Sequence, residues 1–288
     1  MRAPAAKRES TPVNVVAWGS GEPAICVHGS LSWGTFAFRE QRPLARTRAL
    51  LLPDRRGYGS SPPTPRADFD IDAADIAALL DGPADLVGHS YGAVVALLVA
   101  ARRPGSVRTL TLVEPAAFAL ARGNPAVEQL ITALTEVRAA APSLPSGEFV
   151  LRYLEALGYR RGADLPAHLP LTSRSVRAAH ATMTERPPWE AQIPLDALAE
   201  ARRPTLVVSG RWNNLAAGED AVGRRAFAAV GDALARVLEA ERVVIDGWAH
   251  GCQYSGKAFN DVLQAFWDRT RRRRGPSRRW SAALVTRS

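Results

Sequence analysis

A serine at the centre of the motif GHSYG, residues 88–92, is the first candidate for chemistry in this sequence. Ser90 directly follows the apolar run ADLVGH at 84–89 and opens a second apolar run at 91–102. Glycines two positions before and after the serine permit a sharp turn from a strand into a helix, and such a turn exposes the serine hydroxyl above the edge of a sheet. The motif therefore predicts a nucleophilic serine. The competing interpretation is a helix N-cap serine in a tight turn.

The same turn supplies a second chemical group. At the N-terminus of the predicted helix, the backbone N–H of Tyr91 would point to the place where a tetrahedral oxyanion forms. A serine nucleophile also needs a general base, and the base needs an acid that orients it. The sequence offers five histidines, at positions 28, 89, 168, 180 and 250. His250 lies in the loop GWAHGCQ after the strand-like run RVVIDG, and an ordinary surface loop histidine is the competing interpretation.

The elements that must position these groups alternate along the chain. Two short β-rich runs at 12–19 and 23–28, separated by Gly-Ser-Gly-Glu, predict a hairpin. Further strand-like runs alternate with segments of helical period, which indicates a mainly parallel sheet covered on both faces. The expected strands lie at 49–53, 84–89, 107–114, 204–210 and 242–247, and the expected helices at 69–80, 90–103, about 219–240 and about 256–269.

The region between residues 116 and 200 differs from the rest. It contains helical pieces broken by prolines and no strand-like run, so we expect a lobe inserted between two strands of the sheet. Ligands of open α/β sheets bind beyond the carboxyl ends of the strands, and Ser90 and His250 both follow predicted strands.

Composition excludes several classes of protein. The 288 residues are 47% hydrophobic and 23% charged, which is ordinary for a globular protein and excludes disorder for the bulk of the chain. No uninterrupted apolar run reaches about 18 residues, and the N-terminus lacks the apolar stretch of a secretory signal, so a cytoplasmic protein without a membrane span is expected. Cys26 and Cys252 give neither a disulfide framework nor zinc spacing; Cys26 is expected in the core and Cys252 as a buried neighbour of His250.

The net charge of +9 is concentrated at one end. Eight arginines lie in residues 269–288, which contain no acid, and residues 1–268 carry a net charge of only +1. Such a block is usually a solvated, disordered end and only sometimes an arm for an anionic partner. A nucleic-acid-binding function is therefore not expected.

Four motifs together resemble the α/β-hydrolase superfamily over about residues 12–268. They are His28-Gly29-Ser30 after an apolar run, DRRGYGSS at 54–61, the GHSYG motif, and a late strand followed by Gly-x-x-His. The resemblance implies an α/β fold with a mostly parallel sheet, helices on both faces and a helical lid insertion. The expected division is a core at 1–115 and 201–268, a lid at 116–200 and a basic tail at 269–288. Asp54 is expected to brace its loop without acting chemically.

The resemblance also implies roles for individual residues. Ser90 corresponds to the nucleophile and His250 to the general base. Ser30, the residue after His-Gly, corresponds to the second backbone N–H donor of an oxyanion hole, with Tyr91 as the first. His28 is expected to be a hydrogen-bonded structural residue.

The acid of the triad is the point at which this sequence departs from the family pattern. Members usually carry an aspartate three residues after the glycine that ends the strand following the lid, and this position is Asn213. Some members carry the acid at the end of the strand after the nucleophile helix, where Glu114 stands. Glu114 is the favoured interpretation, and a carboxylate oxygen about 2.6–3.2 Å from His250 Nδ1 is expected. Asp220, its neighbour Glu219, or no acid at all remain alternatives.

The sequence as a whole thus predicts a cofactor-independent serine hydrolase that cleaves a small to medium apolar ester or related carbonyl compound through an acyl-enzyme. No metal and no cofactor is expected, and the expected partner is a small-molecule substrate, with no nucleic acid, no membrane and the oligomeric state left open. Activity is expected to fall on acidification, with an apparent pKa of about 6–7 for His250. The alternative, motivated by Asn213, is a catalytically inactive hydrolase-fold protein that binds a ligand or partner.

Overall fold

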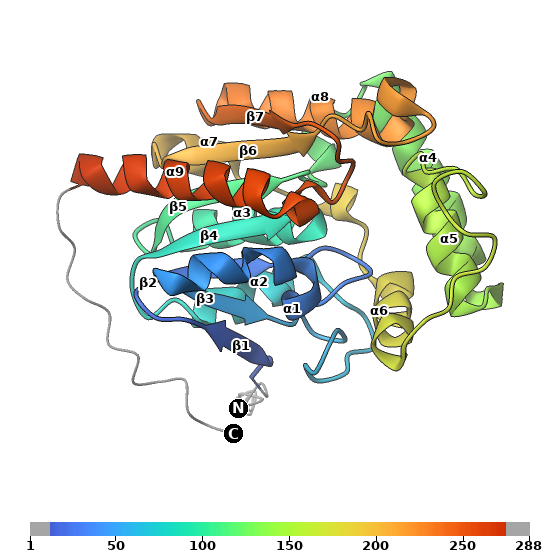
Figure 1. Ribbon diagram of the computed structural model, residues 1–288, viewed down its shortest axis with the longest axis horizontal. Coiled ribbons are helices and arrows are strands. Elements are labelled where there is room, and N and C mark those ends of the chain that lie inside the picture. Colours follow the sequence, from blue (N-terminus) through green and yellow to red (C-terminus); the bar gives the residue numbers. More distant parts are fainter. Residues whose placement is uncertain (1–11, 275–288) are drawn as a thin grey trace, which may run out of the picture.

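The computed structural model describes residues 12–274, in which a central sheet is covered by helices on both faces (Figure 1). Strands β2 to β6 consist almost entirely of buried residues, which explains why they appear in the sequence as continuous apolar runs. The expected α/β fold class is confirmed. The strands are β1 (Val15–Trp18), β2 (Glu22–Val27), β3 (Arg48–Pro53), β4 (Ala84–His89), β5 (Val107–Val113), β6 (Thr205–Gly210) and β7 (Glu241–Ile245).

The strand order is β1-β3-β2-β4-β5-β6-β7, and neighbouring strands are parallel except for β1 with β3. The predicted hairpin of β1 with β2 is therefore wrong, because β3 lies between them and pairs with β1 through Val16 opposite Leu52. Strand β2 is buried on both faces and has a neighbour on each side, whereas the half-buried β1 occupies the antiparallel edge. A local apolar pattern does not reveal which strand is the partner.

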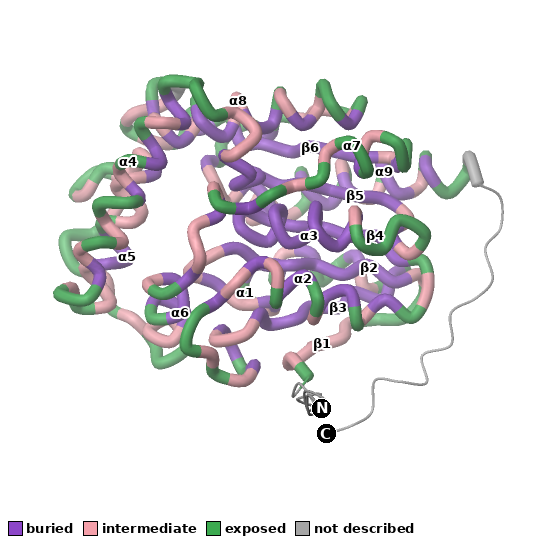
Figure 2. Tube along the Cα trace, turned by 180° about the vertical axis from the view of Figure 1, so that it is seen from behind, coloured by how far each residue is buried: buried purple, intermediate pink, exposed green. Residues whose placement is uncertain are grey.

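Two apolar layers lie on the two faces of this sheet. In β2, Ile25 and Val27 belong to the layer that contains α2 (Phe69–Ala78), α3 (Tyr91–Arg102) and α8 (Val222–Val237). Ala24 and Cys26 belong to the layer that contains η1 (Arg39–Arg46) and α9 (Lys257–Arg274). This alternation follows from the period of two in a strand. Figure 2 shows α3 and the inner strands β2 to β5 almost entirely buried. The helices are α1 (Gly34–Ala37), α2 (Phe69–Ala78), α3 (Tyr91–Arg102), α4 (Pro125–Ala140), α5 (Ser146–Ala156), α6 (Ser173–Thr184), α7 (Leu195–Glu200), α8 (Val222–Val237) and α9 (Lys257–Arg274), with 3₁₀ helices η1 (Arg39–Arg46), η2 (Phe118–Ala121), η3 (Ala141–Ser143), η4 (Pro188–Glu190), η5 (Gly218–Asp220) and η6 (Cys252–Ser255).

Helices α4, α5 and α6 lie beyond the carboxyl ends of the strands, at the right of Figure 1. They supply most of the helical residues in the segment between β5 and β6, for which a lid was expected. The last helix of that segment, α7, instead packs against α3, with Leu198 in the apolar layer of α2, α3 and α8. The end of the segment therefore covers the face of the sheet rather than the strand ends.

The last helix is longer than expected. Helix α9 continues to Arg274, so the predicted boundary at 269 must be corrected and residues 269–274 are helical. Arg269 donates to both carboxylate oxygens of Glu241 in β7, and Thr270 remains buried, so contacts with the body of the protein extend the helix. The remainder of the expected tail, residues 275–288, lies outside the described residues. Across residues 12–274, no helix combines the length and the apolar character needed to cross a membrane.

Candidate active site

Ser90 occupies the turn between β4 and α3, and its backbone is strained. Its φ of 56° and ψ of −118° lie outside the regions that a serine normally adopts. The turn is tight on both sides, because a Cβ atom at Gly88 would lie 2.4 Å from the Gly92 oxygen and one at Gly92 would lie 2.2 Å from the Val27 oxygen. Only glycine fits at these two positions. The turn thereby holds the Ser90 side chain at the carboxyl end of β4.

His250 faces this serine from the loop after β7. Its Nε2 atom lies 2.9 Å from Ser90 Oγ. The end of β6 supports the loop, since the Trp212 N–H donates to the Trp248 oxygen at 2.8 Å. On the other side, His89 Nε2 lies 3.0 Å from the His250 main-chain oxygen. His89, the residue before the serine, thus contacts the loop that carries His250.

Glu114 lies behind the histidine, fully buried and directly after β5. Its Oε1 atom accepts hydrogen bonds from the Gly210 N–H at 2.7 Å and from Trp212 Nε1 at 3.3 Å. Its Oε2 atom lies 3.7 Å from His250 Nδ1, so the expected distance of about 2.6–3.2 Å is not met. The two donors on Oε1 fix the carboxylate at this distance. Among the described residues, neither Glu114 Oε2 nor His250 Nδ1 has a hydrogen-bond partner, and the two atoms face each other.

The other candidates for the acid lie elsewhere. Asp220 ends η5 and is exposed, and no ion pair or hydrogen bond within the described part of the chain joins it to His250. Glu219 precedes it in the same short helix. Asn213 is also exposed, and its Oδ1 accepts from the Gly247 N–H at 2.8 Å. The asparagine thus braces the start of the His250 loop without reaching the imidazole.

Burial shifts both titratable partners toward their neutral forms. Desolvation lowers the pKa of His250 to about 3. Desolvation also raises the pKa of Glu114 to about 8, although the hydrogen bonds from Gly210 and Trp212 act in the opposite direction. A neutral imidazole is the form that can accept a proton from Ser90.

The two expected oxyanion donors flank Ser90. Tyr91 is the first residue of α3, and the N–H groups of a helix's first turn have no partner within the helix. Ser30 follows Gly29, whose backbone approaches the serine so closely that a Cβ atom there would lie 2.9 Å from Ser90 Cβ. The loop carrying Ser30 therefore lies directly against the turn carrying Ser90.

A cavity of about 340 Å³ opens beside Ser90 and His250. Apolar and aromatic side chains dominate its wall, and Phe36 and Trp248 are 40% and 36% exposed. Helix α5 and the residues after it contribute Tyr153, Leu154, Leu157 and Tyr159. Within residues 12–274, no group of three His, Cys, Asp or Glu side chains is placed to hold a metal ion.

The remaining histidines and Cys252 lie outside this cavity. His28 Nε2 accepts the Arg55 N–H at 2.9 Å, in agreement with a structural role. His180 contacts Ser146 between α6 and α5, and His168 is exposed. Cys252 is buried in the layer of α9. Asp54 braces its loop by accepting from the N–H groups of Gly34 and Ser60.

Comparison with known proteins agrees with this geometry. The family model described as "Alpha/beta hydrolase family" matches residues 24–262. This chain belongs to the alpha/beta hydrolase family. The resemblance seen in the four sequence motifs is thereby confirmed.

Individual relatives of this alpha/beta hydrolase match shorter stretches. Lipase LipV of Mycobacterium tuberculosis is 36% identical over 110 residues, which are 36% of this chain and 42% of the lipase. A pimeloyl-[acyl-carrier protein] methyl ester esterase of Chromobacterium violaceum is 41% identical over 96 residues, 33% of this chain and 37% of the esterase. The chain thus spans about two fifths of the length of these curated relatives. An alpha/beta hydrolase of Sphaerobacter thermophilus has the same fold, with a TM-score of 0.62 and 24% identity over 89% of this chain and 99% of the other.

Several residues at the site of this hydrolase-family chain were not found from the sequence. Trp212 donates to Glu114, and Glu185 and Thr182 contact the loop of Ser30. The apolar residues of α5 line the cavity. Trp212, two residues after the glycine that ends β6, was the one local signal available. The contacts of the other residues depend on how the helices beyond the strand ends fold back.

Proposed function

We propose that the protein is a cofactor-independent serine hydrolase that cleaves a small to medium apolar ester or related carbonyl compound through an acyl-enzyme. The observation that carries the proposal is the distance of 2.9 Å between Ser90 Oγ and His250 Nε2 at a strained turn. The names of several relatives, among them a lipase, an esterase and a 2-hydroxymuconate semialdehyde hydrolase, support the same reaction class.

In this mechanism, His250 Nε2 takes the proton of the Ser90 hydroxyl as Oγ attacks the carbonyl carbon. The tetrahedral oxyanion accepts hydrogen bonds from the N–H groups of Tyr91 and Ser30. When the intermediate collapses, the bond to the leaving group breaks and His250 returns the proton to it. Water then attacks the acyl-enzyme with the same help from His250, which releases the acid and restores Ser90. Glu114 supports the imidazolium that forms in each half of the reaction.

The cavity supports the proposed substrate class. Its volume of about 340 Å³ and its apolar wall suit an uncharged acyl group of modest size. Phe36 and Trp248 offer exposed aromatic surface at the cavity for the leaving group or the acyl chain. A small-molecule substrate is accordingly the proposed partner.

A fluorophosphonate probe tests the serine mechanism directly. We expect covalent labelling of the wild type and of Ser60→Ala, in which an exposed serine is removed, and no labelling of Ser90→Ala. Peptide mass spectrometry locates the adduct. A folded wild type that does not react with the probe would favour the alternative of an inactive ligand-binding protein, for which Asn213 at the usual acid position is the motivation.

The pH profile should depend on Glu114 more than on His250. Because burial lowers the pKa of His250 to about 3, we expect protonation of this residue to reduce activity at a pH well below the 6–7 that the sequence predicts. Because the pKa of Glu114 is raised to about 8, its carboxyl gains its charge only as the pH rises through that value. That charge stabilises the imidazolium of the transition state, so kcat/KM for a chromogenic ester should increase from pH 7 to pH 9.

The matched variant is Glu114→Gln, which cannot ionise and should lack this increase. An activity that is constant above pH 7 in both proteins, or an increase that persists in the variant, would contradict the assignment.

A further inference from the structure

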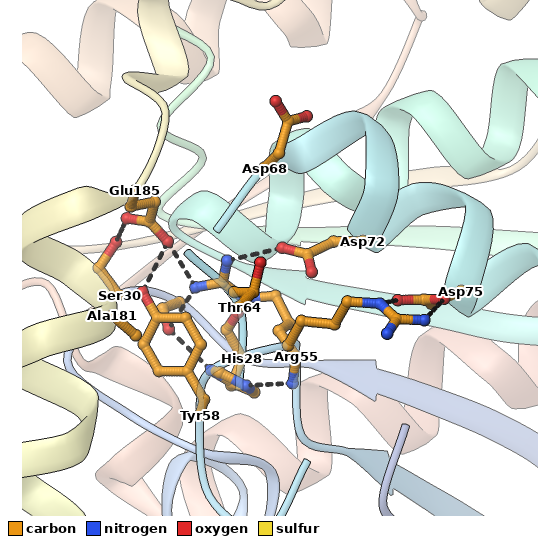
Figure 3. A network of polar contacts seen from close by, with 12 residues as sticks. His28, Ser30, Arg55, Tyr58, Thr64, Asp68, Asp72, Asp75, Ala181 and Glu185 are labelled. Atoms are coloured by element: carbon orange, nitrogen blue, oxygen red, sulfur yellow. Dashed lines mark hydrogen bonds and ion pairs between the residues drawn. The ribbon is translucent and has the colours of Figure 1, made fainter. Parts of the chain in front are cut away.

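The residue after the end of α6, Glu185, reaches into the core beside the loop that carries Ser30. Its carboxylate is 2% exposed and accepts three hydrogen bonds (Figure 3). The donors are the Ser30 hydroxyl at 2.5 Å, Arg55 Nη2 at 2.7 Å and the Tyr58 hydroxyl at 2.8 Å. Thr182, one turn earlier in α6, accepts the Leu31 N–H at 2.9 Å. The end of α6 therefore holds residues 28–31, here called the oxyanion loop, at both a side chain and the backbone.

Arg55 holds the opposite side of the oxyanion loop. It is 1% exposed and pairs with Asp72 as well as with Glu185. Its Nε atom donates to the His28 oxygen and its Nη2 atom to the Gly29 oxygen, both at 3.1 Å. His28 Nε2 accepts from the Arg55 N–H, so the ring proton is on Nδ1, which donates to the Gly29 oxygen at 2.8 Å. The Gly29 carbonyl thus accepts from two buried donors.

The two hydrogen bonds to the Gly29 oxygen fix the direction of the Ser30 N–H group. The Gly29 carbonyl and the Ser30 N–H belong to one peptide unit, and no peptide bond of the described residues is cis. In a trans peptide the two groups point in opposite directions. Because the carbonyl points toward Arg55, the Ser30 N–H points away from Arg55, and the adjoining Gly29 lies against Ser90.

We propose that Glu185 and Thr182 are positioning residues. Together with Arg55 they hold the Gly29–Ser30 peptide in the orientation in which the Ser30 N–H can bind the oxyanion. The oxyanion hole is therefore complete only when the end of α6 is docked on the oxyanion loop. The inference rests on the proposed serine hydrolase function. Loss of the Glu185 contacts leaves the positive charge of Arg55 balanced by Asp72 alone and removes one partner of the Ser30 hydroxyl. The Gly29–Ser30 peptide is then less constrained against rotation. The two positioning residues act on the tetrahedral intermediate and on the transition states that lead to and from it, because the oxyanion is absent from the bound substrate.

The test compares Glu185→Gln with Glu190→Gln, an exposed carboxylate of the same segment that pairs with Arg186. Steady-state hydrolysis of nitrophenyl butyrate gives kcat and KM per active site, counted by fluorophosphonate titration. The inhibition constant of benzeneboronic acid, which forms a tetrahedral adduct on the serine, reports the oxyanion hole itself. Loss of a whole oxyanion donor costs about 10²–10³ in kcat. For a displaced donor we expect kcat of Glu185→Gln to fall by about 10- to 100-fold, KM to stay within about twofold and the boronic acid to bind correspondingly more weakly.

Thr182→Val is the second variant, because it removes the acceptor of the Leu31 N–H without changing size or charge. This variant should also have a lower kcat and bind the boronic acid more weakly. If Glu185→Gln does not fold, the result for Thr182→Val is the test of the proposal. A role limited to stability would lower the number of active sites but leave the boronic acid constant of the remaining sites unchanged, and that result overturns the inference. Failure of the proposed function is a separate result: the wild type would neither react with the fluorophosphonate nor lose activity on Ser90→Ala.

Discussion

Replacement of Ser90 by alanine should reduce turnover by about 10⁶ while the protein remains folded, because removal of a triad serine leaves only binding and the oxyanion hole to accelerate the reaction. The backbone of the turn should tolerate the change. Alanine carries the same Cβ atom as serine, so the strain at a φ of 56° is neither added nor relieved. The hydroxyl that is lost contacts His250 Nε2, and no larger packing contact disappears with it.

The measurement is the hydrolysis of a chromogenic ester by the wild type, Ser90→Ala and the control Ser60→Ala, with thermal unfolding of each followed by circular dichroism. The control should keep both its activity and its melting temperature. If Ser90→Ala retained more than a few per cent of the wild-type activity, the nucleophile would have to be a different group.

Most of the fold could be predicted because its signals are local. Apolar runs of five to seven residues mark β3, β4, β5 and β6, and the helical period of 69–80 marks α2. Strand pairing is not local. The pairing of β1 with β3 depends on a strand that comes about thirty residues later, so the sequence suggested a hairpin instead. The extension of α9 to Arg274 depends in the same way on Glu241, which lies in another element.

The residues of the candidate site also differ in whether a local sequence pattern reveals them. Ser90 and His250 stand in loops with a recognisable local pattern, so they could be named before their contact was known. Glu185 and Ser30 are 155 residues apart, and no periodicity or motif connects them. Glu114 is an intermediate case: its place at a strand end could be read, whereas its distance from His250 depends on donors from Gly210 and Trp212, about a hundred residues later.

The assignment of Glu114 as the acid leads to the second prediction, that Glu114→Gln lowers kcat at least a hundredfold. The amide can still accept the Gly210 N–H through its oxygen, but its NH₂ group then faces His250 Nδ1. This donor favours the tautomer whose proton is on Nε2, and that form cannot take a proton from Ser90. The equivalent change in a protease triad costs about 10⁴. We expect a smaller loss at neutral pH because the raised pKa of Glu114, about 8, already leaves part of the wild type uncharged there.

Asn213→Ala and Asp220→Asn are the matched controls for kcat. Asn213 braces Gly247 at the surface and Asp220 is exposed, so each should change kcat only mildly. A large loss in Asp220→Asn together with a nearly silent Glu114→Gln would mean that the acid was misassigned.

As the pH rises, the stability of the folded protein should fall while its activity increases. This contrast separates a catalytic role of Glu114 from a structural one. The pKa of its carboxyl is about 8 in the folded protein, above the 4.5 of an ordinary glutamate. The unfolded chain therefore binds fewer protons than the folded one between these values, and the folded state loses stability as the pH rises through that range. Glutamine has no proton to lose, so Glu114→Gln should melt at a higher temperature than the wild type at pH 9 while its kcat is far lower. Calorimetric scans at pH 5 and pH 9 measure this difference, and a variant that melts lower than the wild type at both pH values would show that the carboxylate holds the fold together rather than supporting His250.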